Sequence, residues 1–123
     1  LVRSRGLGDV YKRQINMKVI FHVVEQDKWS SVISNVRDLL DNIEDIQVEI
    51  IAMSKAAALF NRYSGVDFHG VMGNPKVNIT IGKKALEENK LTPELIPSEI
   101  KVEDLVITKI VRLQNEGYAY IRL

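Results

Sequence analysis

Hydrophobic residues follow two different spacings along the chain, and each spacing predicts a different element. Residues 18–24 form a mostly apolar run that is typical of a strand buried on both faces of a parallel sheet, and residues 47–53 predict a second strand. Residues 77–81 alternate apolar and polar side chains, which indicates a further strand. Short strands are also predicted at residues 100–102 and 118–121, the second of which is rich in aromatic and β-branched side chains.

A long amphipathic helix is predicted between the first two strands, because apolar residues recur there at steps of three and four. The stripe consists of Trp29, Val32, Ile33, Val36, Leu39, Leu40 and Ile43. We expect Trp29 to anchor the core or an interface, and Asp27 to cap the start of this helix through its carboxylate. Shorter helices are predicted after Met53, over residues 82–90 and from Thr92.

The chain ends in a helix that turns into a strand. Val106, Ile110 and Leu113 mark the inward face of this helix. Glu103 or Asp104 is expected to cap its start, and Gly117 to end it in the left-handed conformation. Strands that alternate with helices predict an α/β domain, in which the crossover between the first two strands is right-handed.

The composition excludes several kinds of chemistry. The 123 residues suit one domain with a single core, and no apolar run approaches the length of about 18 residues that a membrane span needs. The chain has no cysteine, so disulfides, thiolate metal ligands and thiol catalysis are excluded.

The apparent basicity of the chain comes from its first sixteen residues. Residues 9–14 fit the translation of an end sequence used in transposon-based library preparation, so we expect residues 1–16 to be a foreign or disordered leader and residues 17–123 to be one domain; the alternative is a natural basic arm. Without the leader, 13 basic residues face 15 acidic ones, and the net charge falls from +1 to −2. Charge therefore gives no argument for nucleic-acid binding. A cytoplasmic location is expected, although the leader leaves open that a signal peptide has been replaced.

The candidate ligand-binding residues lie where strands turn into helices, since open α/β sheets bind ligands at the carboxyl ends of their strands. Ser54 and Lys55 follow the second strand, and Gly82, Lys83 and Lys84 follow the third. Backbone N–H groups and the serine hydroxyl at such corners can hold an anion. The simpler alternatives are that the serine only caps a helix and that the two lysines only lie on a solvated face.

Two histidines are secondary candidates. His22 lies inside the first predicted strand, where a packed core residue is the commoner role. His69 and Asp67 lie in a segment with three glycines, at residues 63–75, whose spacing matches neither the Walker pattern nor the dinucleotide fingerprint. A histidine and an aspartate without a third partner are weak evidence for a metal, and we predict neither a metal nor a cofactor.

Several segments in order give the chain a resemblance to a known family. They are Lys18-Val-Ile-Phe-His-Val, Trp29 at the opening of the long helix, Val48-Glu-Ile-Ile-Ala, residues 86–96 and Ile110-Val-Arg-Leu-Gln-Asn-Glu-Gly-Tyr-Ala-Tyr-Ile. Over residues 17–123 the chain resembles the DsrE/DsrF-like family, which includes the TusD-type sulfur-relay proteins. The resemblance implies a three-layer α/β sandwich with a mainly parallel five-stranded sheet, helices on both faces, and assembly into trimers or hexamers.

The resemblance also implies a reactive site that this chain has altered. In the sulfur-relay members a cysteine at the end of the third strand carries a persulfide, and the corresponding corner here holds Gly82. No other side chain replaces a thiolate in that role. In addition, Met53-Ser54 stands where relatives commonly carry Asn-Gly.

Three functional hypotheses remain open at this point. The first is a non-catalytic, homo-oligomeric binding or assembly protein that holds a small anionic ligand or a protein partner at the two corners. The second is an enzyme that uses His22, His69 and Asp67 as acid–base groups. The third is an accessory subunit of a sulfur-relay system. We favour the first, with neither nucleic acid nor membrane as a partner.

Overall fold

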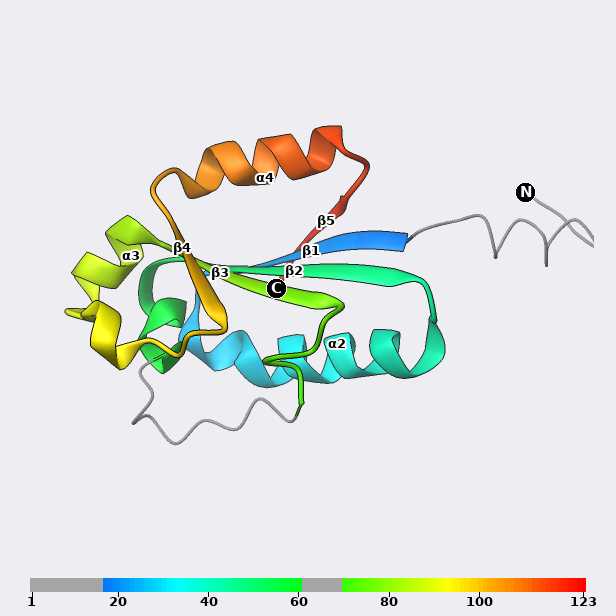
Figure 1. Cartoon of the computed structure of the whole chain (residues 1–123), viewed down its shortest axis with the longest axis horizontal. Helices are drawn as coiled ribbons and strands as arrows, with labels where there is room; N and C mark the ends of the chain where they lie inside the picture. Colours follow the sequence, from blue (N-terminus) through cyan, green and yellow to red (C-terminus); the bar gives the residue numbers. More distant parts are fainter. Residues whose placement is uncertain (1–16, 61–69) are drawn as a thin grey trace, which may run out of the picture.

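The computed structural model describes residues 17–60 and 70–123, and its centre is a parallel sheet (Figure 1). The sheet has five strands in the order β4-β3-β2-β1-β5, and every neighbouring pair is parallel. The strands are β1 (Met17–Val23), β2 (Ile46–Ala52), β3 (Val77–Gly82), β4 (Ile100–Glu103) and β5 (Ala119–Arg122). All five predicted strands are confirmed, each within about one residue of its predicted ends.

Helices cover both faces of the sheet, which confirms the three-layer α/β sandwich. Helix α2 (Trp29–Asn42) lies against one face and α4 (Val106–Asn115) against the other (Figure 1). The shorter helices are α3 (Lys83–Glu88) and the 3₁₀ turns η1 (Gln26–Lys28), η2 (Ser54–Phe60) and η3 (Pro93–Leu95). In the part of the chain that the structure describes, no helix is long and apolar enough to cross a membrane.

The sheet face toward α2 carries the main hydrophobic core. Alternate residues of β1, β2 and β3 point to this face and are all buried: Val19, Phe21, Val23, Val48, Ile50, Ala52, Val77, Ile79 and Ile81. The predicted helical stripe meets them, with Trp29, Val32, Ile33 and Val36 buried. The indole Nε1 of Trp29 donates a hydrogen bond to the carbonyl oxygen of Ala56 at 2.8 Å. The prediction that Trp29 anchors the core is therefore confirmed.

The opposite face of the sheet is only partly apolar. Ile20 and Ile51 pack there against the inward side of α4, formed by Val106, Ile110 and Leu113. The other buried side chains on this face are polar, namely those of His22, Glu49 and Thr80. Because burying a polar group is costly unless it is hydrogen-bonded, this face needs partners that the α2 face does not.

Two of the predicted N-caps are wrong, and the predicted C-terminal end of α4 is confirmed. Asp27 does not cap α2, because it lies inside the turn η1 and the N-cap position falls on Lys28 without a side-chain cap. Neither Glu103 nor Asp104 caps α4, whose N-cap is Leu105. The end of α4 is as predicted, with Gly117 at φ +99°. The next N–H, that of Tyr118, donates to the carbonyl of Leu113 at 3.1 Å, the hydrogen bond of a Schellman motif.

Candidate functional site

An open cavity of about 300 Å³ lies at the carboxyl ends of β2 and β3. Its lining comes from the corner after β2, the corner between β3 and α3, and the start of α4. The lining residues are Met53, Ser54, Gly82, Lys84, Ala85, Glu88, Asp104, Leu105, Val106, Ile107 and Thr108. The volume is at the lower end of the range for small-molecule sites, and the position is the usual one for ligands of open α/β sheets.

The structure brings three of the five candidate residues together. Ser54, Gly82 and Lys84 line the cavity. Lys55 and Lys83 are exposed and lie outside the described lining. Lys83 and Lys84 are the first two residues of α3, so their side chains leave the helix in directions about 100° apart. Only the second of them reaches the cavity.

Ser54 lies in an unusual backbone conformation. Its φ is +51°, a left-handed value that costs a serine on the order of 1 kcal/mol and that recurs at ligand sites. The corner is fixed from outside, because the side-chain amide of Asn89 donates to the carbonyl oxygens of both Ser54 and Ala85 at 2.7 Å. Asn89 therefore ties the end of β2 to α3 along one side of the cavity.

Gly82 is required by the close approach of α4. A Cβ atom at this position would lie 2.8 Å from Cγ2 of Val106, a distance at which one of the two groups must shift. Val106 is itself buried at the first turn of α4, and a β-branched side chain has little rotameric freedom in a helix. The corner is consequently filled by the neighbouring helix and leaves no room for a side chain at residue 82.

The charges around the cavity are mixed. Lys84 contributes a cation, whereas Glu88 and Asp104 contribute carboxylates. The start of α4 adds a partial positive charge, because the first N–H groups of a helix have no partner within it. No acidic residue lies in the first turn of α4, and Leu105 provides no side-chain cap. Lys84 and the start of α4 are therefore the positive features of the cavity, and Glu88 and Asp104 are the negative ones.

His22 lies deeper, behind Met53. It is 7% exposed, its Nδ1 lies 2.6 Å from the hydroxyl of Tyr120, and its Nε2 lies 2.9 Å from the sulfur of Met53. Burial and, to a smaller extent, the positive charge of Arg122 lower the pKa of His22, so the imidazole is neutral near pH 7. In the neutral ring, Nε2–H donates to the sulfur and Nδ1 accepts from the phenol, since two facing lone pairs would repel each other.

His22 is the packed, hydrogen-bonded residue that its place in a strand suggested. Its partner histidine in the acid–base hypothesis, His69, and Asp67 both lie outside the described residues. Among the residues that the structure describes, no group of three or more His, Asp or Glu side chains converges as a metal site would require.

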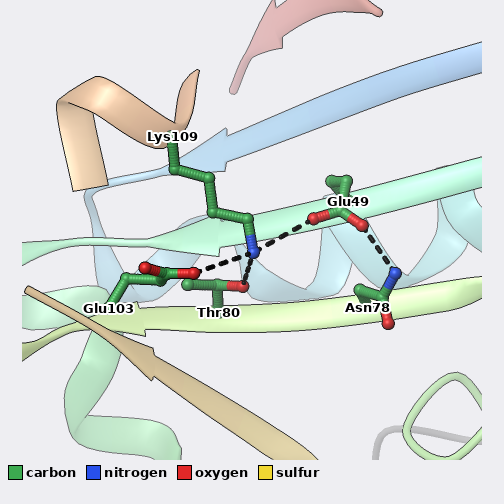
Figure 2. Close-up of polar contacts among 5 residues, drawn as sticks. All are labelled: Glu49, Asn78, Thr80, Glu103 and Lys109. Carbon is green, nitrogen blue, oxygen red and sulfur yellow. Dashed lines mark hydrogen bonds and ion pairs between the residues drawn. The ribbon is translucent and has the colours of Figure 1, made fainter. Parts of the chain in front are cut away.

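A buried ionic network beneath α4 is the main feature that the sequence analysis missed (Figure 2). Lys109 is 6% exposed, and its Nζ donates to Oγ1 of Thr80 at 2.7 Å. The same Nζ lies 3.4 Å from Oε1 of Glu49 and 3.8 Å from Oε1 of Glu103. The other carboxylate oxygen of Glu49 accepts a hydrogen bond from the amide of Asn78 at 2.7 Å. The network joins β2, β3, β4 and α4, and so fixes the helix whose start lines the cavity.

The fold and the cavity define the class: a small three-layer α/β protein with an open pocket at the carboxyl edge of its sheet. Among solved structures, the chain is similar to a protein of unknown function, MTH1491, from Methanobacterium thermoautotrophicum. The two share 27% sequence identity with a TM-score of 0.77 over 87% of this chain and 99% of that one. No protein-family model and no curated protein matches the chain.

Proposed function

We propose that the chain is a DsrE/DsrF-like protein that does not carry a persulfide and instead holds a small anionic ligand in the cavity beside Gly82. The cavity is the observation that supports this proposal most directly, because it opens at the corner where the resembling proteins place their reactive cysteine. A phosphate or carboxylate group would lie between Lys84 and the start of α4, and apolar atoms of Met53 and Val106 would contact the rest of the ligand. We expect this function in the cytoplasm.

The lost thiol and the filled corner support a binding role over sulfur transfer. The chain contains no cysteine, and a persulfide needs one. In addition, Val106 occupies the space that a side chain at residue 82 would need. Both facts are expected of a protein that keeps the pocket of the proteins it resembles but no longer transfers sulfur.

Exchanging Lys84 for glutamine tests where the anion lies. We expect Lys84→Gln to weaken binding of phosphate-bearing or carboxylate-bearing ligands about three- to fivefold, the effect of removing one exposed charge partner. Ligands are found by a thermal-shift screen of phosphates, nucleotides and carboxylates, and the affinity for each hit is then measured by calorimetry.

The neighbouring residue is the matched control. Lys83→Gln removes the same charge one residue earlier, from a side chain outside the described lining, and should change the affinity by less than about 1.5-fold. Equal losses in the two variants would mean that only the overall charge matters. The proposal fails if no anion in the screen shifts the melting temperature or appears in the cavity of soaked crystals.

We also propose that the protein assembles into homo-oligomers, either trimers or hexamers. The supporting observation is the number of large apolar side chains that face solvent. On and beside α4, Leu105 is 69% exposed, Ile107 61% and Val111 51%. At the two edge strands Val102, Tyr120 and Ile121 are between 39% and 46% exposed. Ile107 and Val111 lie four residues apart and so share the outer side of α4, and exposed apolar side chains that share one helix face are typical of contact surfaces between proteins.

Placing a charge on the outer side of α4 tests the assembly. We expect wild-type protein at micromolar concentration to have the mass of an oligomer in light scattering, and Val111→Lys to shift it toward the monomer. Arg112→Lys keeps the charge of an exposed position on the same helix and should leave the mass unchanged. A wild-type protein that is already monomeric would contradict the proposal.

A further inference from the structure

Two side chains that are good ligands for soft metal ions meet at the inner end of the cavity. Met53 follows β2 and lines the cavity, and His22 lies behind it on β1. The ring nitrogen Nε2 of His22 and the sulfur of Met53 are 2.9 Å apart. Met53 thus lines the cavity while its sulfur contacts the imidazole, so the pair of donor atoms lies beside open space.

We propose that His22 and Met53 bind a soft monovalent cation of the Cu(I) type at the inner end of this cavity. A thioether sulfur is a soft ligand that selects Cu(I), and imidazole nitrogen suits copper as well. Mg²⁺ and Ca²⁺ require oxygen ligands, which this pair does not offer. The remaining coordination position faces the cavity, where water or a small exogenous ligand completes the site.

The distance between the two donor atoms requires a small adjustment on binding. Bonds as long as those of zinc, about 2.0 Å to nitrogen and 2.3 Å to sulfur, at an angle near 120°, would place the two donor atoms about 3.7 Å apart. Compared with the observed 2.9 Å, the sulfur must therefore retreat by about 0.8 Å. Met53 can do so, because methionine has an unbranched, adaptable side chain and this one borders open space.

Tyr120 allows the imidazole to change tautomer without losing its orientation. Before binding, Nε2–H donates to the sulfur and Nδ1 accepts from the phenol hydroxyl. When the ion takes the lone pair at Nε2, the ring proton resides on Nδ1 and donates to the phenol oxygen, whose own hydrogen turns toward solvent. Tyr120 is 40% exposed, so water can accept that hydrogen. No proton is released, and the ring keeps the outer hydrogen bond that metal-bound histidines usually have.

This site shares Met53 with the proposed anion pocket but uses neither Lys84 nor the start of α4, so variants at Lys84 and at His22 separate the two proposals. Its test is a titration of the purified full chain with Ag(I) in chloride-free buffer, and with Cu(I) under anaerobic conditions against a competing chelator. We expect one ion per chain by native mass spectrometry. Met53→Leu should weaken binding by at least about tenfold, as should His22→Asn, and Tyr120→Phe should weaken it by a smaller factor.

The chain supplies its own controls, because it has three methionines and two histidines. Met72→Leu and His69→Asn should leave the affinity within about twofold of wild type. In ¹⁵N spectra, Ag(I) should move the Nε2 resonance of His22 in wild-type protein and not in Met53→Leu, a variant that preserves the shape of the side chain. Absence of Ag(I) binding, or an affinity that Met53→Leu leaves unchanged, would show that the contact is only an N–H···S hydrogen bond.

Discussion

Replacing Lys109 with methionine will lower the free energy of unfolding by about 3–5 kcal/mol, because it leaves the carboxylate of Glu49 buried without its cation. Both side chains are almost fully covered, Lys109 at 6% and Glu49 at 4% exposure. The variant also removes the donor to Oγ1 of Thr80. The measurement is urea unfolding followed by the fluorescence of Trp29, the single tryptophan of the chain.

A second substitution separates the buried charge from the packing of the lysine stem. Glu49→Gln in the Lys109→Met background removes the unpaired carboxylate, while its side-chain amide can still accept a hydrogen bond from Asn78. We expect the double variant to recover at least about half of the lost stability. Lys101→Met, at an exposed position of β4, is the control and should change stability by less than about 0.5 kcal/mol. A loss below about 1 kcal/mol for Lys109→Met would mean that the ion pair is dispensable.

The network also explains how a single helix stays in place over a partly polar sheet face. On the α2 side, apolar packing alone can hold the helix. On the α4 side, where the packing is only partly apolar, Lys109 fixes the position of the helix by contacting residues of β2, β3 and β4. Because α4 begins at the cavity, a helix that shifted or rotated would change the shape of the pocket. The stability of the ion pair and the geometry of the candidate site are therefore physically linked.

Elements set by local spacing could be predicted from the sequence. The stripe of α2, the C-terminal end of α4 at Gly117 and the positions of the five strands depend on residues near one another in the chain. The two predicted N-caps, on α2 and α4, are wrong for reasons that local residue spacing does not reveal. Asp27 was drawn into a 3₁₀ turn, and Glu103 stays in β4, where its carboxylate faces Lys109.

The candidate site was predictable in its position and not in its details. Ser54 follows β2 and Gly82 ends the adjacent parallel strand β3, so both had to lie at one edge of the sheet, and they do line one cavity. Which of Lys83 and Lys84 reaches the cavity could not be predicted, because it depends on the residue at which α3 begins. The ionic network could not be predicted in the same way, because it forms only where β2, β3 and α4 come together in space. Its signals were present as polar residues inside predicted strands and as a lysine beside the inward position Ile110.

Replacing Gly82 with cysteine will not create a reactive thiol at this corner, and it will destabilise the protein by about 1–3 kcal/mol. The cause is the 2.8 Å approach between the new Cβ and Cγ2 of Val106, which forces the buried start of α4 away from the sheet. Thr108→Cys is the matched control, because it places a thiol on the same cavity at an exposed position and should cost less than about 0.5 kcal/mol. Thiol labelling should be fast in Thr108→Cys and slow in Gly82→Cys.

Because the contact with Val106 causes the loss of stability, shortening the side chain of Val106 should restore part of it. Val106→Ala removes the methyl group that the new side chain meets, so Gly82→Cys should cost at least about 1 kcal/mol less in that background than in wild type. The same pair of variants bears on the proposed function, since it places a thiol with room beside it at the edge of the candidate cavity. If Gly82→Cys is as stable as wild type and labels rapidly, the corner is open, and the packing of α4 does not explain why glycine stands there.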